Sequence, residues 1–394
     1  MTGPLTTLKI LDFTALLPGP FATMTLADLG ADVVRIESPN RPDLVRVMPP
    51  FRGGVSVVHA QLNRNKSSLA LDLKQPGARE VIYRLLSTYD IVFEAFRPGV
   101  MQRLGLDYAT LQTHCPRLIY VSITGYGQTG SYKNRAGHDL NYMALSGALS
   151  SNGRVASGPA PMSLQVADLA GGAGHALTGV LAAVIHRQHT GEGQYIDLSM
   201  TEALFSLQVL TAPASLAEQT SPGLESELLN GGSCYDCYAC ADGQYLAVAP
   251  LEPQFFAEFM AIIERPDLLP FMTLQNPADV KWLKTELAST LCQQPRAFWL
   301  EKLAHRDCCV EPVLDFQEAC RHPALSERQM VVTVPSHDRQ ENLLQIASPL
   351  RFSGTPVQLR HAGGPIGADN REVLSRAGWS TDEIVQLEAE KILL

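Results

Sequence analysis

Two short segments of this sequence carry side chains suited to moving a proton. Gly137-His138-Asp139-Leu140-Asn141-Tyr142 places an imidazole beside a carboxylate just after a glycine, and Asp168-Leu169-Ala170-Gly171-Gly172 places another carboxylate at the expected start of a glycine-rich helix. Both segments are expected on irregular backbone, where binding and catalytic groups concentrate. Acid/base groups of both kinds are what proton transfer at carbon requires. The pair therefore indicates acid/base chemistry.

Each of these residues also has a purely structural interpretation. A histidine near a turn often serves only the fold. Aspartate is among the preferred N-cap residues, so Asp168 could be a helix cap. Glu252-Pro253 is typical of a helix start, because proline suits the first turn and an acidic group there is favoured by the helix dipole. Taken one at a time, the residues leave both interpretations open.

Two other motifs suggest cofactors or metals but lack the context these need. The segment Gly125-Tyr126-Gly127-Gln128-Thr129-Gly130 has dinucleotide-type glycine spacing, yet no helical pattern follows and the next acidic residue comes too early. We expect a tight turn there. Cys234, Cys237 and Cys240 are spaced like metal ligands, but no fourth ligand follows at suitable spacing. The sequence thus predicts no metal site and no bound cofactor.

Composition sets the class of protein. The chain has 394 residues, of which 45% are hydrophobic and 18% charged, as in globular enzymes. A net charge of −9 disfavours a nucleic-acid binder. We expect no membrane span, no secretory start in Met1–Leu5 and no peroxisomal address in Lys391–Leu394. Eight cysteines without a secretory signal indicate reduced thiols, and hence a cytoplasmic protein.

Secondary-structure patterns indicate an α/β fold. Short apolar runs alternate with helical periodicity over residues 8–127, which predicts right-handed βαβ units and a Rossmann-like parallel sheet. A long helix is expected from about Asp168 to Gln188 and another from Thr201 to about Leu216. From about Ser226 to Ser326 a short β region precedes several helices, which suggests a smaller domain. The expected strands are Leu8–Thr14, Asp32–Ser38, Leu69–Leu73, Asp90–Phe96, Leu118–Thr124 and Gln194–Leu198, and the shorter expected helices are Phe21–Leu29, Ala78–Tyr89 and Tyr108–His114.

With these segments in view, the chain resembles the class III CoA-transferase (CaiB/BaiF) superfamily over nearly its whole length. The resemblance lies in the order and spacing of many short motifs rather than in any single one. They are Gly19-Pro20-Phe21-Ala22, Leu29-Gly30-Ala31-Asp32-Val33-Val34-Arg35-Ile36-Glu37, Leu71-Asp72-Leu73-Lys74, Phe96-Arg97-Pro98-Gly99-Val100, Arg103-Leu104-Gly105-Leu106, Thr124–Gly130 and Thr190-Gly191-Glu192-Gly193-Gln194-Tyr195-Ile196-Asp197.

Within the superfamily the chain is most similar to the α-methylacyl-CoA racemase branch. The segment 137–142 has the racemase form, whereas transferases usually lack the histidine. Ala241-Asp242-Gly243 followed by Leu251-Glu252-Pro253-Gln254-Phe255 resembles the racemase segment that supplies a catalytic glutamate, and Asp168 matches an aspartate shared by both branches. The cysteines at 234–240 fall where the family needs none.

The resemblance implies epimerisation at C2 of a 2-methylacyl-CoA thioester. Without a cofactor, two acid/base groups must act on opposite faces of a planar enolate. The groups implied are His138, oriented or charge-tuned by Glu252, on one face and Asp168 on the other, with Asp139 in support. Backbone N–H groups at the start of the Asp168 helix are expected to stabilise the enolate oxygen.

The resemblance also implies residues that bind coenzyme A, which is here part of the substrate. A local basic patch of Lys74, Arg97 and Arg103 is expected to meet its phosphates. Ser38 stands where racemases often carry an arginine that meets the nucleotide, and Arg41 is a candidate substitute. The full implied set of CoA and substrate contacts is Arg35, Leu71, Asp72, Leu73, Lys74, Glu94, Arg97, Arg103, Gly137, Leu140, Asn141 and Tyr142.

The superfamily further implies an interlocked homodimer with the active site in a cleft shared by a large and a small domain. The large Rossmann-like domain is expected over residues 1–200, the small α+β domain over 225–326, and a C-terminal segment over 330–394 returning to the large domain. Two alternatives stay open. In a CoA-transferase Asp168 would be a nucleophile that forms an anhydride, and in a non-catalytic acyl-CoA-binding paralogue neither reaction occurs.

Overall fold

The structure, a computed structural model, describes residues 3–272 and 276–394, and its contacts divide the chain into two compact units. Unit 1 contains the chain up to Ser146 together with Leu164–Leu207 and Pro323–Leu394. Unit 2 contains Gly147–Ser163 and Gln208–His322. The chain therefore enters unit 2 once near residue 147, returns at 164, and enters it again at 208.

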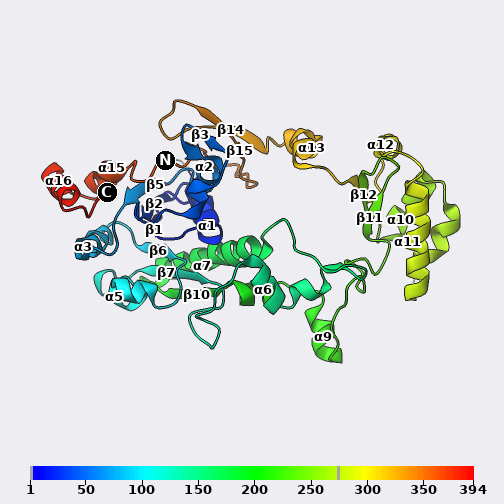
Figure 1. The fold of residues 1–394 in the computed structure, drawn as a ribbon, viewed down its shortest axis with the longest axis horizontal. Coiled ribbons are helices and arrows are strands. Elements are labelled where there is room, and N and C mark those ends of the chain that lie inside the picture. Colours follow the sequence, from blue (N-terminus) through cyan, green and yellow to red (C-terminus); the bar gives the residue numbers. More distant parts are fainter. Residues whose placement is uncertain (1–2, 273–275) are drawn as a thin grey trace. The chain divides into compact units, whose positions relative to one another are not determined.

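Unit 1 is built on a parallel six-stranded sheet (Figure 1). Counted along the chain, its strands lie in the order 3-2-1-4-5-6, which is that of a doubly wound Rossmann-type fold. Every neighbouring pair in the sheet is parallel, so the predicted α/β class is confirmed. In spatial order the strands are β5 (Ser67–Ala70), β2 (Asp32–Glu37), β1 (Lys9–Asp12), β6 (Ile91–Glu94), β7 (Ile119–Thr124) and β10 (Tyr195–Ser199).

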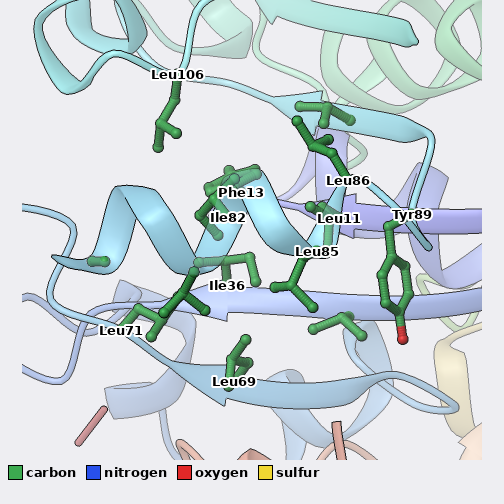
Figure 2. Close-up of a cluster of buried hydrophobic side chains, with 14 of the residues drawn as sticks. Leu11, Phe13, Ile36, Leu69, Leu71, Ile82, Leu85, Leu86, Tyr89 and Leu106 are labelled. Carbon is green, nitrogen blue, oxygen red and sulfur yellow. The ribbon is translucent and has the colours of Figure 1, made fainter. Parts of the chain in front are cut away.

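The core of unit 1 lies between the sheet and the helices that cover it. Figure 2 shows Ile82 and Leu85 of helix α3 (Pro76–Leu85) among the strand residues Leu11, Ile36 and Leu69, all of them buried. Helix α3 begins at a proline, and its apolar residues recur at helical spacing. Burying each such side chain stabilises the fold by about 1.5–3 kcal/mol, so Leu85→Ala should cost about 2–5 kcal/mol.

The long helix predicted from Asp168 is present, but its first part is irregular. Residues Ala167–Gly174 form a π-helical segment, η3, that continues into α7 (His175–Thr190). Helix α7 ends at Gly191, whose φ of 80° is left-handed and favours glycine. Together η3 and α7 are long and apolar enough to meet the criterion for a membrane span. Their contacts with α1 (Pro18–Asp28), β7 and β10 are those of a helix that covers a sheet.

The single helix predicted over Thr201 to Leu216 is wrong in its middle. Two shorter helices are found instead, α8 (Met200–Ser206) and α9 (Ala212–Glu218). Pro213 lies in the first turn of α9, where its missing N–H costs nothing. In a continuous helix the same proline would remove a hydrogen bond and clash with the preceding turn, so the chain breaks there.

The end of the chain lies against the first half of unit 1. Leu393 forms an antiparallel bridge with Leu71, and the Asp369 carboxylate accepts the Ser68 N–H at 2.7 Å. A capping box of Ser380 and Glu383 begins the last helix. The remaining elements of unit 1 are η1 (Leu44–Val47), β3 (Phe51–Arg52), β4 (Val55–Ser56), α2 (Val57–Leu62), α4 (Val100–Leu104), α5 (Tyr108–His114), α6 (Asp139–Leu145), α14 (Pro323–Ser326), β14 (Val331–Pro335), β15 (Asn342–Ile346), α15 (Asn370–Arg376) and α16 (Thr381–Ala389).

Unit 2 has its own core between a small antiparallel sheet and several helices. Phe256 and Phe259 of α10, Leu246 of the central strand and Leu287 of α11 are all buried in it. Its elements are η2 (Ala148–Ser151), β8 (Gly153–Arg154), β9 (Gly158–Pro159), α9, β11 (Asp236–Ala239), β12 (Tyr245–Val248), α10 (Pro253–Ile262), η4 (Pro266–Phe271), α11 (Pro277–Leu291), α12 (Arg296–Leu303), β13 (Val310–Pro312) and α13 (Phe316–Arg321).

Candidate active site

A cavity of about 410 Å³ lies at the carboxyl ends of the central strands of unit 1. The strand order reverses between β1 and β6, and ligands of open parallel sheets bind in the crevice at such a switch point. The volume suits a small-molecule site. The walls come from the segments after β1 (Leu16, Pro18), after β6 (Phe96, Arg97) and after β7 (Thr124, Gly125, Tyr126), from Lys133, Arg135, Gly137, His138, Asn141 and Tyr142, and from Asp168 and Met200.

His138 is the N-cap residue of α6, and its side chain lines this cavity. Its backbone is extended, and its N–H donates to the side-chain oxygen of Asn141 at 3.0 Å. Asn141, which belongs to the predicted segment 137–142, thus caps the first turn of α6. The side chain of His138 is exposed and lines the cavity, so the imidazole is available to a ligand bound there.

Asp139 and Asp168 are joined by a hydrogen bond. The buried Asp139 carboxylate accepts the backbone N–H of Asp168 at 3.0 Å, which ties the start of α6 to the start of η3. Burial, together with the negative charge of Asp139, raises the pKa of Asp168 to about 6. Asp168 lies in the first turn of the π-helical segment, not at its N-cap. Its side chain lines the cavity, so a capping role does not account for it.

The π-helical segment is rich in small residues and packs closely against its neighbours. A side chain at Gly172 would meet Met200 Sδ at 3.1 Å and Pro18 Cβ at 3.1 Å. The ring Nδ1 of His175 lies 2.9 Å from the Gly171 carbonyl oxygen, and that contact satisfies a group in the irregular turn. π-Helical turns are rare and recur at functional sites. Asp168 lies in the first turn of this segment and lines the cavity.

Two tyrosines pack against glycines that the sequence motifs contain. The Tyr142 hydroxyl donates to the Gly137 carbonyl oxygen at 2.6 Å. A side chain at Gly125 would come within 2.4 Å of the Tyr142 ring, and one at Gly137 within 2.5 Å of the Tyr126 hydroxyl. Burial, with the charge of Asp168 next in size, raises the pKa of Tyr142 to about 12. Tyr142 is therefore a neutral wall beside the carboxylate.

Three basic side chains line the cavity, of which the sequence had indicated one. Arg97 was an expected contact, whereas Lys133 and Arg135 were not predicted as site residues. The Arg135 guanidinium lies 4.1 Å from the centre of the Tyr132 ring. The signal that could have found them is the alternation of basic residues directly before Gly137.

Other expected CoA contacts do not line the cavity. Arg35 is 2% exposed, and its guanidinium pairs with Asp43 at 2.5 Å and donates to Asn63. This expectation needs correction, because an arginine held in an internal ion cluster is not available to a phosphate. Glu94 and Leu71 are also buried within unit 1.

The remaining expected contacts lie on the surface of unit 1, outside the cavity lining. Lys74 is exposed after β5, and its N–H donates to the Asp72 carboxylate at 3.1 Å. Arg103 is exposed on α4, and Leu140 is exposed on α6. Leu73 is half-buried between Asp72 and Lys74.

Glu252 belongs to unit 2, where it is the N-cap residue of α10. Its backbone is extended and Pro253 follows in the first turn, as the helix-start interpretation predicted. Burial is the main cause of a raised pKa at Cys309, and the charge of Glu252 is the next. Glu252 and Cys309 are thus neighbours within unit 2.

The cysteine motif and the glycine motif have ordinary structures. Cys234 and Cys240 are buried and Cys237 is exposed. Within residues 3–272 and 276–394, no three His, Cys, Asp or Glu side chains gather as metal ligands would. After β7 the Gly125–Gly130 segment forms a turn and opens no helix, as expected. Gly127 and Gly130 have φ of 82° and 78°.

Comparison with known proteins places the chain in a family. Residues 5–370 match CoA-transferase family III. The α-methylacyl-CoA racemase of Homo sapiens is 36% identical over 392 residues, covering 98% of this chain and 96% of that protein. The succinyl-CoA:mesaconate CoA-transferase of Haloarcula hispanica is 32% identical, covering 96% and 98%. A CAIB/BAIF family protein of known structure from Brucella suis has a TM-score of 0.84 at 26% identity, covering 96% of this chain and all of that one.

The chain therefore belongs to CoA-transferase family III, a family of enzymes that act on acyl-CoA substrates. This confirms the resemblance found in the sequence. The similar proteins include both racemases and CoA-transferases, so family membership alone does not decide between the two reactions.

Proposed function

We propose that this enzyme epimerises 2-methylacyl-CoA thioesters at C2 by proton transfer through an enolate. The observation that carries the proposal is that His138 and Asp168 line one cavity, at the switch point of the sheet. A nucleophilic aspartate alone would need no imidazole in the same cavity. A two-base reaction uses both side chains, and it needs no cofactor beyond the coenzyme A of the substrate.

In the proposed reaction one base removes the C2 proton, and the electron pair of the C–H bond becomes part of the enolate. The conjugate acid on the opposite face then delivers a different proton to C2, which inverts the centre. A pKa of about 6 suits Asp168 to both roles near neutral pH, since it can hold or release the proton. His138 acts from the other face, and Glu252 has the orienting role that the family resemblance implies.

The start of the π-helical segment would stabilise the enolate oxygen only in part. The Asp168 N–H, one of the donors expected from the sequence, is already bonded to Asp139. The basic side chains of Arg97, Lys133 and Arg135 supply positive charge at the same cavity. Positive charge near a developing oxyanion lowers the barrier of enolate formation.

The proposal includes the homodimer and the cytoplasmic location expected from the sequence. Support for a partner copy comes from the segment that contains α8 and α9, which exposes several large apolar side chains. Val209, Leu210 and Leu216 are 69%, 75% and 76% exposed, and Phe205 is 58% exposed. Large apolar side chains left exposed in this way are typical of protein interfaces. Light scattering after size exclusion should give twice the chain mass of 42.9 kDa.

The test is proton exchange in D2O with each enantiomer of a 2-methylacyl-CoA, without any acceptor acid. The native enzyme should place one deuterium at C2 and invert the centre. His138→Ala and Asp168→Ala should each lower racemisation by about 10²–10⁴-fold. Each variant should keep slow exchange without inversion, for opposite enantiomers, because one base remains.

His189→Ala, which removes an exposed histidine at the end of α7, is the matched control and should racemise normally. Glu252→Gln should slow racemisation less than loss of either base. A CoA-transferase would exchange no C2 proton, would require a second carboxylic acid, and would stay active without His138. A non-catalytic acyl-CoA-binding protein would do neither reaction. Full racemisation by both alanine variants would exclude the two-base mechanism.

A further inference from the structure

Glu94 occupies an unusual place for a residue expected to touch the ligand. It is the last residue of β6 and is only 3% exposed. One carboxylate oxygen accepts the Phe96 N–H at 2.8 Å, and the other accepts the hydroxyl of Ser122, which is fully buried in β7. Phe96 and its neighbour Arg97 form one wall of the cavity.

Ser122 extends this connection to a second wall. Its hydroxyl oxygen accepts the Gln128 side-chain N–H at 2.6 Å, and the Gln128 backbone N–H donates to the Asp197 carboxylate at 3.1 Å. Gln128 belongs to the glycine turn after β7, in which Gly125 and Tyr126 line the cavity. The network therefore joins the loop after β6 to the turn after β7.

We propose that Glu94 is a positioning residue that holds the Arg97 loop and the Tyr126 turn in a fixed relation around the acyl-CoA thioester. The chemical identity of the ligand rests on the proposed function, whereas the connection itself does not. The Arg97 loop and the Tyr126 turn leave the sheet from two different strands, β6 and β7. Because the two oxygens of one buried carboxylate face two different walls, loss of either hydrogen bond frees one wall from the other.

The charges around Glu94 make this connection sensitive to pH. The titratable groups that face it are Tyr120 of β7 and Tyr195 and Asp197 of β10, and none of these is a cation. Burial raises the pKa of Glu94 to about 7, against the opposing effect of its two hydrogen bonds. The ionised carboxylate accepts from both walls. The protonated form loses one acceptor position, so the walls should be held less firmly below pH 7.

The experiment compares Glu94→Gln with Glu80→Gln, which makes the same change at an exposed position on α3. Binding of 2-methylpropanoyl-CoA is measured by calorimetry at pH 6 and pH 8. At pH 8 Glu94→Gln should bind about tenfold more weakly than the native protein, since misplaced binding groups lose affinity steeply. The difference should shrink at pH 6. Glu80→Gln should match the native protein at both values.

Amide hydrogen exchange gives a readout that needs no ligand. In Glu94→Ala, which removes both acceptor oxygens, exchange should quicken in both residues 95–98 and residues 125–130, because one network holds both walls. Ser122→Ala, which keeps the Phe96 contact, should quicken exchange mainly in the 125–130 turn, and it carries the test if Glu94→Ala fails to fold. Unchanged exchange in either wall of Glu94→Ala would overturn the proposal.

The two proposals fail separately. If the native protein does not bind 2-methylpropanoyl-CoA but exchange quickens in both walls, the proposed function fails and the positioning role stands. If the native protein racemises and binds, and Glu94→Gln matches it in affinity while Glu94→Ala matches it in exchange, only the positioning role fails.

Discussion

Two buried carboxylates occupy equivalent places on the two strands that flank the switch point. Asp12 ends β1 and Glu94 ends β6. Each accepts the backbone N–H of the residue two positions ahead, Thr14 at 2.9 Å in one case and Phe96 at 2.8 Å in the other. Both therefore fix the first residues of a loop that goes on to line the cavity.

Their electrostatic surroundings differ. The Asp12 carboxylate accepts hydroxyl hydrogens from Thr14 and Thr23 and pairs with the Lys66 ammonium at 3.0 Å. Burial alone would raise its pKa, but the charges of Lys66 and Arg35 bring it below the ordinary value. Glu94 forms no ion pair in the part of the chain that the structure describes.

The comparison shows that the same backbone contact can be made by a carboxylate with a cation partner and by one without. Asp12 is a permanent anion whose loop is set at any physiological pH. Burial raises the pKa of Glu94 to about 7, so we expect its loop to respond to protons near neutral pH. The loop after Glu94 carries Arg97, which lines the cavity, whereas Asp12 holds the loop that leads into α1.

The largest predicted effect comes from removing the ion pair between Asp12 and Lys66. Lys66→Met should leave a fully buried carboxylate without its partner and lower the free energy of unfolding by about 3–5 kcal/mol. Urea-induced unfolding at pH 7 measures this. Lys74→Met, which alters an exposed lysine, should change stability by less than about 0.5 kcal/mol. Equal stability of Lys66→Met and native protein would show that Asp12 needs no fixed charge.

A smaller effect is expected on the Glu94 side, and it depends on pH. Because the folded-state pKa of Glu94 is about 7, above its ordinary 4.5, the fold favours the protonated form. That contribution is complete below about pH 4.5 and is lost as the pH rises through 7. The native protein should thus lose roughly 1 kcal/mol more stability between pH 6 and pH 8 than Glu94→Gln does. Urea-induced unfolding of both proteins at both pH values measures this. If the native protein and Glu94→Gln lose the same stability between pH 6 and pH 8, Glu94 does not differ from Asp12 in its response to pH.

The smallest effect concerns Asp168, a third carboxylate, whose pKa lies between those of Asp12 and Glu94. Its pKa of about 6 has burial as its first cause and Asp139 as its second. The rate of deuterium exchange at C2 of the enantiomer whose proton Asp168 removes should rise with pH around 6. Asp139→Asn keeps an oxygen for the Asp168 N–H but removes the charge, so the midpoint should move to lower pH by a fraction of a unit. A midpoint that stays in place would show that burial alone sets this pKa.

The sequence predicted the parts of the fold that depend on local pattern. The six strands of the parallel sheet all lie within or beside the predicted apolar runs, and α5 has the predicted bounds Tyr108–His114. Buried parallel strands are almost wholly apolar, so periodicity and composition reveal them. The sequence pattern failed where one residue interrupts a longer helix: Pro213 lies in the first turn of α9, so α8 and α9 are separate helices.

For the site, the sequence by itself determined which residues can do chemistry, because His138 and Asp168 stand in motifs with family-specific order. Only the tertiary structure decided their surroundings. The hydrogen bond from Asp168 to Asp139, the burial of Arg35 and the addition of Lys133 and Arg135 to one cavity all depend on how distant segments meet. A side chain's type is written in the sequence, whereas its solvation and its charged neighbours arise only when the chain has packed.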